Sequence, residues 1–239
     1  MRLAIIPARS GSTRIKNKNI VDFNGKPLIS YPLNAAKNSG VFDKIHVSTD
    51  SQMYVDVVKD LGFETDFLRA SEMGENSTDL ADVLRWVVGE YEKRGETVSE
   101  ICMLTATSPL IEAEDIVRLR EVFIEHDGTK PVLAVTSFPA PIEQSLKISD
   151  EGHLQAVYPD KFHLHSQNLM KAYQDAGSLF YIGRDQLMEG KVEAYSECYP
   201  LILDREKVVD IDEHEDLAIA EALYLGIKAR RERKAVASK

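Results

Sequence analysis

The chain has 239 residues, 44% of them hydrophobic, which is enough for one large domain with a sizeable core. No apolar run approaches the roughly 20 residues that span a bilayer, and the first one, residues 3–6, is too short for a secretory signal. We therefore expect a soluble cytoplasmic protein with no membrane partner. The formal net charge of −10 argues against a broad nucleic-acid-binding face. The two cysteines lack metal-ligand spacing and are expected to be reduced thiols.

Strand-length apolar stretches alternate with helical periodicity along most of the chain. The predicted strands are residues 3–7, 44–48, 65–68, 100–104, 131–136, 178–183 and 201–203. The predicted helices are residues 29–38, 52–61 (capped by residues 49–51), 80–94 (capped by residues 77–79), 112–125 and 213–231. This alternation predicts a single α/β domain over residues 1–239, in which helices flank a mostly parallel, twisted sheet.

The alternation breaks between Ser137 and Asp175. This stretch is rich in proline, aromatic residues and histidine, and it is too long for an idle loop in a compact domain. We expect an excursion of about residues 137–175 that protrudes from the sheet and contributes to a binding pocket or to a subunit contact.

A basic loop follows the first predicted strand. Its cations are Arg9, Arg14, Lys16 and Lys18, and small residues separate the first two. Residues 1–26 carry six cations and one carboxylate, so the rest of this acidic chain has a net charge of −15. A local positive island with backbone N–H groups at a strand end predicts a site for a small polyphosphate. The loop matches neither the P-loop nor the G-x-G-x-x-G pattern, and a solvated basic turn is the alternative.

Four polar clusters follow predicted strands. They are the Arg9–Lys18 loop and residues 48–50, 105–109 and 210–212. Because ligands bind beyond the carboxyl ends of the strands in open α/β sheets, we expect these clusters to converge on one rim.

Asp210 and Asp212 place two carboxylates on one side of a short extended segment, with Ile211 pointing the other way. Hard oxygen ligands near a phosphate loop suit Mg²⁺. The alternative is that Asp212 only caps the helix that begins near Glu213. The sequence leaves both interpretations open.

With these residues in view, the chain resembles the cytidylyltransferases that activate acidic nine-carbon sugars, the CMP-sialate synthetase family. The similar motifs are Ala8-Arg9, Gly11-Ser12, Lys18-Asn19, Gly25-Lys26-Pro27-Leu28, Thr107-Ser108-Pro109-Leu110 and the D-x-D pair. The branch that uses pseudaminic acid looks most similar, through residues 136–142, 158–159, 166–167 and 173–177. The resemblance implies a Rossmann-like nucleotide-diphospho-sugar transferase fold with a protruding dimerisation or sugar-binding excursion, and a homodimer.

The implied reaction is transfer of CMP from CTP to the anomeric hydroxyl of pseudaminic acid, a 2-keto sugar acid, with release of pyrophosphate. N-acetylneuraminic, legionaminic and Kdo acids are the alternative acceptors, and a non-catalytic phosphate-binding module is the alternative of another class. His165, Gln174 and Ile111 depart from the pattern of the family, and these departures bear on which sugar is bound.

The motifs and the resemblance together imply roles for single residues. The expected catalytic residues are Arg9, Lys18 and Asp212. The expected nucleotide-binding residues are Ala8, Arg9, Gly11, Ser12, Arg14, Lys18, Asn19, Arg69 and Thr78. The expected sugar-binding residues are Thr105, Thr107, Ser108, Gln167 and Asp175, and the expected Mg²⁺ ligands are Asp210 and Asp212. Thr13 stands where the family usually has lysine, so Arg14 is expected to supply that charge.

Overall fold

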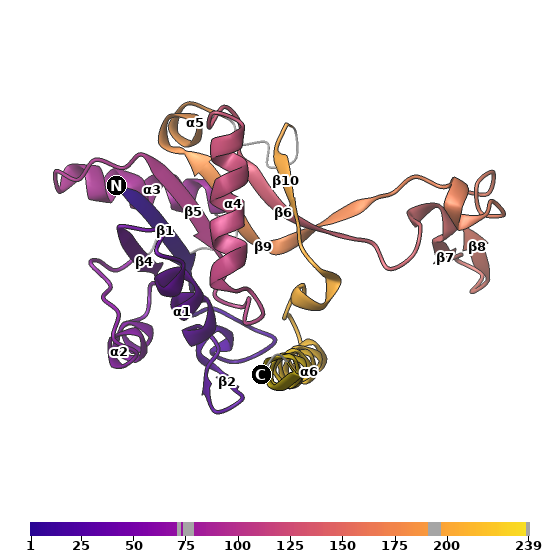
Figure 1. Cartoon of the computed structure of the whole chain (residues 1–239), viewed down its shortest axis with the longest axis horizontal. Helices are drawn as coiled ribbons and strands as arrows, with labels where there is room; N and C mark the ends of the chain where they lie inside the picture. The colour runs from indigo at the N-terminus through magenta and orange to yellow at the C-terminus, as the bar shows by residue number, and fades with distance from the viewer. Residues whose placement is uncertain (71–72, 74–78, 191–196, 238–239) are drawn as a thin grey trace.

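The computed structural model describes residues 1–70, 73, 79–190 and 197–237, and Figure 1 shows their arrangement. A six-stranded sheet forms its centre, in the order β10-β6-β9-β5-β1-β4. The strands are β1 (Arg2–Pro7), β4 (Lys44–Ser48), β5 (Glu100–Leu104), β6 (Val132–Ser137), β9 (Tyr173–Gly183) and β10 (Tyr199–Ile202). Five strands run in one direction, and β9 runs against both of its neighbours. The predicted mostly parallel sheet is confirmed.

Helices cover both faces of the sheet because its strands alternate apolar side chains between the two faces. Ile5 of β1 and Met103 of β5 pack with α3 (Leu80–Lys93) and α5 (Arg184–Glu189). On the other face, Ile6 and Leu104 pack in a cluster with three helices. These are α1 (Ser30–Ser39), α2 (Gln52–Asp60) and α4 (Ala113–Glu125). Among the described residues, no helix combines the length and the apolar character needed to cross a membrane.

A third apolar cluster joins the N-terminal loop to the last helix, α6 (His214–Ala237). Its buried members are Ile15, Phe23, Leu28, Ile211 and Ala220. Phe23 belongs to the small hairpin of β2 (Asp22–Phe23) and β3 (Lys26–Pro27). Because Ile15 of the basic loop and Ile211 of the D-x-D segment are buried in the same cluster, these two segments lie side by side.

Two local predictions are wrong, and a third, the cap of α2 at residues 49–51, is confirmed only in its position. Residues 65–68 contain no strand. Phe67 instead packs its ring against His46 of β4 and Tyr91 of α3, at centroid distances of 4.4 and 5.1 Å, so this segment fills space beside the sheet. Ser51 is the N-cap of α2 but makes no side-chain capping hydrogen bond. β9 begins at Tyr173, well before the predicted residue 178, because it extends along β6 toward the excursion.

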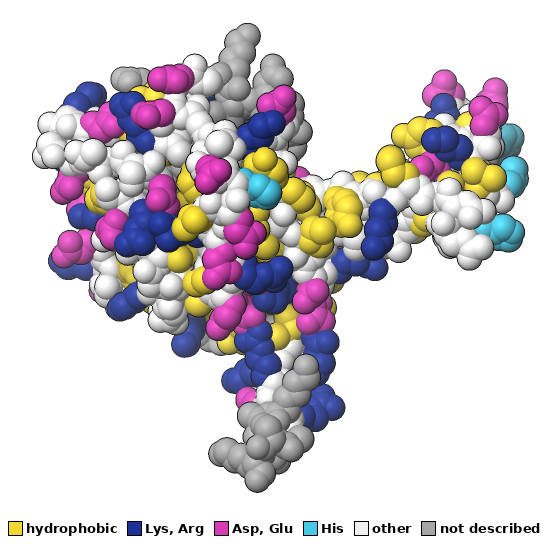
Figure 2. All heavy atoms as spheres, turned by 45° about the horizontal axis from the view of Figure 1, so that its top comes forward, with side chains coloured by type: hydrophobic (Ala, Val, Ile, Leu, Met, Phe, Trp, Pro, Cys, Tyr) yellow, Lys and Arg dark blue, Asp and Glu magenta, His cyan; other side chains and the backbone are white. Residues whose placement is uncertain are grey.

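The predicted excursion is present as an arm, residues 138–172, between β6 and β9 (Figure 1). It contains the hairpin of β7 (Leu146–Ile148) and β8 (Leu154–Ala156) and the short 3₁₀ segments Ile142–Gln144 and Ser166–Asn168. Ile148 and Leu154 face each other across the hairpin and are 73% and 69% exposed. Figure 2 shows hydrophobic side chains along the arm and histidines near its end. The subunit contact expected for this arm stays a prediction.

Candidate active site

A pocket of about 380 Å³ lies beyond the carboxyl ends of β1 and β5. Its lining residues come from the basic loop, from the segment after β5, from the start of α3 and from the D-x-D segment. They are Pro7, Arg9, Ser12, Thr13, Arg14, Lys18, Asn19, Arg69, Met73, Leu80, Val83, Thr105, Ala106, Thr107 and Asp212. The predicted convergence of strand-end clusters on one rim therefore holds for three of the four clusters directly, and the fourth contacts the basic loop.

That fourth cluster, residues 48–50, fixes the start of the basic loop. The Ala8 N–H donates to the Ser48 carbonyl at 2.9 Å. The Ser10 N–H and hydroxyl donate to the two carboxylate oxygens of Asp50 at 2.9 and 3.0 Å. From within the loop, the amide of Asn19 donates to the Arg9 carbonyl at 3.0 Å. Polar side chains thus hold the loop in one path over the pocket.

The carboxylate of Asp212 faces two cations of the basic loop. Lys18 Nζ approaches one oxygen at 3.0 Å, and the Arg14 guanidinium approaches the other at 2.7 Å. Lys18 also donates to the Ile211 carbonyl at 2.6 Å, and its side chain is only 18% exposed. These cations, Lys18 first, hold the pKa of Asp212 below its usual range.

The contacts of the Asp212 side chain are ion pairs with Arg14 and Lys18 and include no helix cap among the described residues. The Asp216 carboxylate, in the first turn of α6, accepts hydrogen bonds from the N–H groups of Asp212 and Glu213 at 3.0 and 2.8 Å, and so joins the segment before the helix to its first turn. Ile211 is fully buried, as the alternation predicted. The carboxylate of Asp212 therefore remains available to the pocket.

Asp210 lies beside this group but does not line the pocket. Desolvation and the neighbouring charge of Asp212 raise the pKa of Asp210. Two aspartates on one segment suit Mg²⁺, which takes few protein carboxylates and shares oxygens with substrate phosphates. Within the described part of the chain, no group of three or more His, Cys, Asp or Glu side chains gathers to hold a metal ion. Asp210 and Asp212 are the residues here that could supply carboxylate oxygens to such an ion.

Arg69 also lines the pocket and is only 6% exposed. Its guanidinium donates to the Ser48 hydroxyl at 3.0 Å and to the Ser48 carbonyl at 2.6 Å. Desolvation by burial lowers the pKa of Arg69. Thr78, the other nucleotide candidate from this region, lies outside the described residues.

The predicted sugar-binding residues divide into two groups. Thr105 and Thr107 line the pocket, whereas Ser108, Asp175 and Gln167 do not. Thr105 contacts the Ser108 hydroxyl and donates to the Gly177 carbonyl at 3.0 Å, and the Gly177 N–H donates to Asp175 at 2.8 Å. Gly177 adopts φ +62°, a left-handed conformation that suits glycine, where the β6–β9 register shifts. Asp175 is thereby tied to the pocket rim.

Three further predicted site residues lie outside the lining of this pocket. Gln167 lies on the arm, in the Ser166–Asn168 segment. Ala8 is buried in the core, and neither Ala8 nor Gly11 is among the residues that line the pocket. The sequence analysis missed an apolar wall formed by Met73, Leu80 and Val83. Helical periodicity predicts α3 but does not indicate which of its apolar residues borders a pocket.

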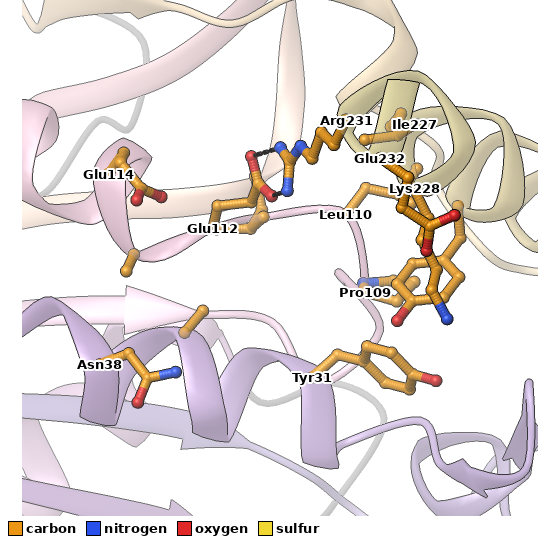
Figure 3. A pocket seen from close by; sticks show the side chains of 14 residues that line it. Tyr31, Asn38, Pro109, Leu110, Glu112, Glu114, Ile227, Lys228, Arg231 and Glu232 are labelled. Carbon is orange, nitrogen blue, oxygen red and sulfur yellow. Dashed lines mark hydrogen bonds and ion pairs between the residues drawn. The ribbon is translucent and has the colours of Figure 1, made fainter. Parts of the chain in front are cut away.

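A second pocket, of about 550 Å³, lies between α1, the start of α4 and α6 (Figure 3). Tyr31 and Pro109 lie on one side of it, and Arg231 of α6 forms an ion pair with Glu112 across it. This pocket is larger, but the predicted cations and Asp212 line only the smaller one. We assign the candidate active site to the smaller pocket.

The fold is that of nucleotidyltransferases. The structure is similar to that of CMP:2-keto-3-deoxy-manno-octonic acid synthetase complexed with CTP, with a TM-score of 0.70, 16% identity and coverage of 94% of this chain and 98% of that one. It is also similar to 4-diphosphocytidyl-2C-methyl-D-erythritol synthase from Anaerococcus prevotii, with a TM-score of 0.59, 13% identity and coverage of 94% and 96%. Identities this low establish the fold alone.

Residues 3–217 match the cytidylyltransferase family, and the chain belongs to it. A pseudaminic acid cytidylyltransferase of Campylobacter jejuni is 32% identical over 93% of this chain and 95% of its own length. A CMP-N,N'-diacetyllegionaminic acid synthase of Legionella pneumophila is 32% identical over 92% and 95%. An N-acylneuraminate cytidylyltransferase of Streptococcus agalactiae is 30% identical over 90% of this chain and 51% of its own length.

Proposed function

We propose that the protein transfers CMP from CTP to pseudaminic acid, giving CMP-pseudaminic acid and pyrophosphate. Membership of the cytidylyltransferase family and the similarity to the Campylobacter enzyme over nearly both full lengths support this substrate. The observation that carries the proposal is the meeting of Arg9, Arg14 and Lys18 with Asp212 around one pocket. With CTP as the nucleotide donor, we propose that the reaction takes place in the cytoplasm.

In the proposed reaction, the anomeric hydroxyl of the sugar acid attacks the α-phosphorus of CTP. The new O–P bond forms as the bond to the departing pyrophosphate breaks, and the hydroxyl proton is lost. Such a transfer needs positioning and positive charge more than a covalent nucleophile. Arg9, Arg14 and Lys18 would neutralise the triphosphate, and Ser12 and Asn19 would donate hydrogen bonds to it. Arg69 and Thr78 are the proposed contacts for cytidine and ribose.

We further propose that Asp210 and Asp212 hold Mg²⁺ together with the triphosphate. The ion would supply positive charge at the α-phosphate and favour ionisation of the attacking hydroxyl. Asp212 is paired with Arg14 and Lys18 in the protein alone. Phosphate oxygens compete for the same cations, so binding of CTP would release this carboxylate. Binding of CTP and of the metal should therefore favour each other.

For the sugar acid, we propose that Thr105 and Thr107 form the floor of the site, with Ser108 and Asp175 at its edge and Gln167 contributing from the arm. The arm exposes large apolar side chains, which is typical of an interaction surface. We propose that it mediates a homodimer.

An acceptor panel tests the proposed function. Purified protein is incubated with CTP, Mg²⁺ and one acid at a time, namely pseudaminic, N,N'-diacetyllegionaminic, N-acetylneuraminic or Kdo acid, and pyrophosphate is measured. We expect release that depends on the acid and is fastest with pseudaminic acid. Faster release with another acid would overturn the substrate, and binding of CTP without release for any acid would indicate a non-catalytic module.

A further inference from the structure

Asp50 contacts the start of the basic loop from a neighbouring strand end. Its two carboxylate oxygens accept hydrogen bonds from one residue, from the Ser10 N–H at 2.9 Å and from the Ser10 hydroxyl at 3.0 Å. Ser10 stands between Arg9, which lines the active-site pocket, and the Gly11-Ser12 pair. A carboxylate that binds one residue through two donors fixes both its backbone and its side chain.

The contacts around Ser10 restrict the backbone path of the loop. The Ser10 carbonyl accepts from the Ser12 N–H at 3.0 Å, and the Arg9 carbonyl accepts from the Asn19 amide at 3.0 Å. The Ala8 N–H is held by the Ser48 carbonyl. Together with the contacts of Asp50, these bonds engage the backbone on both sides of Arg9. The direction in which the Arg9 side chain points from the backbone is therefore fixed by these hydrogen bonds.

The charge of Asp50 is unfavourable for an anion site. A carboxylate this close to the basic loop repels a triphosphate and weakens the positive potential there. The N-cap of α2 is Ser51, so Asp50 is not the cap of that helix. The charge of Asp50 also opposes the lowering of the pKa of the buried Arg69 by desolvation, whereas its carboxylate hydrogen bonds are with Ser10.

We propose that Asp50 is a positioning residue for the nucleotide: through Ser10 it orders the basic loop so that Arg9 and the backbone around Gly11 meet the triphosphate. The inference rests on the proposed function, since it concerns the same site. Asp50 itself does not line the pocket. It acts through the loop, so its loss should reduce affinity for CTP far more than it slows turnover at saturating CTP.

The opposite end of β4 supplies a matched control. Asp43, just before this strand, accepts from the Arg2 N–H at 2.7 Å and from the Arg2 guanidinium at 2.8 Å. Like Asp50, it ties the β4 region to the β1 region through one backbone and one side-chain donor, but it lies away from the pocket. Asp43→Ala therefore removes a similar tether without touching the basic loop.

The test compares wild type, Asp50→Ala, Asp50→Asn and Asp43→Ala by calorimetric binding of CTP and of CMP, by KM and kcat, and by melting temperature. We expect Asp50→Ala to weaken CTP binding and raise its KM by roughly 10- to 100-fold with a smaller change in kcat, as a misplaced positioning group does. CMP, which lacks the β- and γ-phosphates, should lose less affinity. Asp50→Asn should recover most of the CTP affinity, because its amide oxygen can accept from the Ser10 N–H while its NH2 group donates to the Ser10 hydroxyl oxygen.

Asp43→Ala should lower the melting temperature and leave the affinity for CTP unchanged. Unchanged CTP affinity in Asp50→Ala would overturn the inference, and so would an Asp50→Asn variant as impaired as the alanine variant. If Asp50→Ala does not fold, Ser10→Ala takes its place in the comparison. We expect Ser10→Ala to weaken CTP binding modestly and Asp50→Asn to keep most of the CTP affinity. Failure of the proposed function would give a different result from failure of this inference: the wild-type protein would release no pyrophosphate with any acid.

Discussion

At the scale of single residues, the pocket depends on charges held close together and partly out of water. Lys18 is the most enclosed of the cations that face Asp212, and it bonds both the carboxylate and the preceding carbonyl. A cation with two fixed acceptors has little freedom, so its charge stays in place for a phosphate group. Lys16, two residues earlier, is exposed and does not line the pocket.

Lys18→Ala should therefore reduce kcat/KM for CTP by about 10²–10³, the usual effect of removing one preorganised electrostatic donor. Lys16→Ala removes the same kind of side chain from the same loop and should change kcat/KM by less than about twofold, because a solvated charge is screened. Steady-state kinetics of the two variants check this, and similar values for both would contradict the assigned role of Lys18.

His46 offers a pH dependence at the same scale. It is fully buried in β4, where its Nδ1 contacts the Tyr91 hydroxyl at 3.0 Å, and its Nε2 has no hydrogen-bond partner among the described residues. Burial lowers the pKa of His46 to about 4. The unfolded chain, with a pKa near 6.5 for this group, takes up the proton first as the pH falls. The contribution of His46 to the free energy of unfolding is therefore fully present above about pH 6.5 and is lost progressively as the pH falls toward 4.

We expect acidification from about pH 6.5 to about pH 4 to lower the free energy of unfolding by up to about 3 kcal/mol through His46 alone. Urea unfolding of wild type and His46→Gln at pH 7, 5.5 and 4.5 measures it. The variant should start less stable at pH 7 and lose less on acidification. Parallel losses in both proteins would show that His46 does not titrate in this range.

At the scale of elements, the site is assembled by apolar packing as much as by charge. Ile15 and Ile211 are buried in one cluster with α6, which places the basic loop beside the D-x-D segment although almost two hundred residues separate them. The alternation of Asp210-Ile211-Asp212 predicted that the isoleucine would turn inward. It did not indicate that Ile15 would be the neighbour, because periodicity within a segment carries no information on which distant segment covers it.

Ile211→Ala should lower the unfolding free energy by about 2–5 kcal/mol, as other large-to-small core changes do. It should also reduce kcat well below wild type at a temperature where the variant is fully folded, because Asp212 is then held less firmly. Ile182→Ala in β9 is a matched control, similarly buried but in the separate cluster that packs against α3 and α5. It should lose similar stability and keep its kcat, and equal losses of kcat would contradict this account.

The sequence predicted well those elements whose pattern is local. β1, β4 and β5 and the four main helices on the sheet were found within a few residues, because apolar alternation and helical periodicity are properties of each segment. The failures arose from tertiary contacts. Residues 65–68 have a strand-like composition, but they form no strand, and Phe67 packs its ring against His46 and Tyr91. The early start of β9 depends on pairing with β6, and the contact of Asp50 with Ser10 joins two separate loops.

At the scale of the whole molecule, the arm, residues 138–172, exposes apolar side chains that belong to none of the three apolar clusters of the described chain. It projects from the sheet and carries a hairpin whose apolar side chains are mostly exposed (Figures 1 and 2). A two-stranded hairpin is marginally stable by itself in water. A second copy of the chain would bury these side chains and stabilise the hairpin.

The double variant Ile148→Asp and Leu154→Asp should therefore be monomeric where the wild type is dimeric, because it puts two carboxylates on the exposed cross-strand pair next to the loop of the hairpin. Light scattering after size exclusion measures the mass of each. Ile124→Asp on α4 also changes an exposed isoleucine and should remain dimeric. A monomeric wild type, or a double variant of unchanged mass, would show that the arm does not mediate a homodimer.

The central claim is that the early cations and the late aspartates act together on CTP across one pocket. The most direct measurement is pyrophosphate release from CTP, Mg²⁺ and pseudaminic acid by wild type and by Asp212→Ala, with the melting temperature of both. We expect release by the wild type, none above background by the variant, and similar melting temperatures, because the capping contacts of Asp216 remain. Near-normal release by a folded Asp212→Ala variant would contradict the claim.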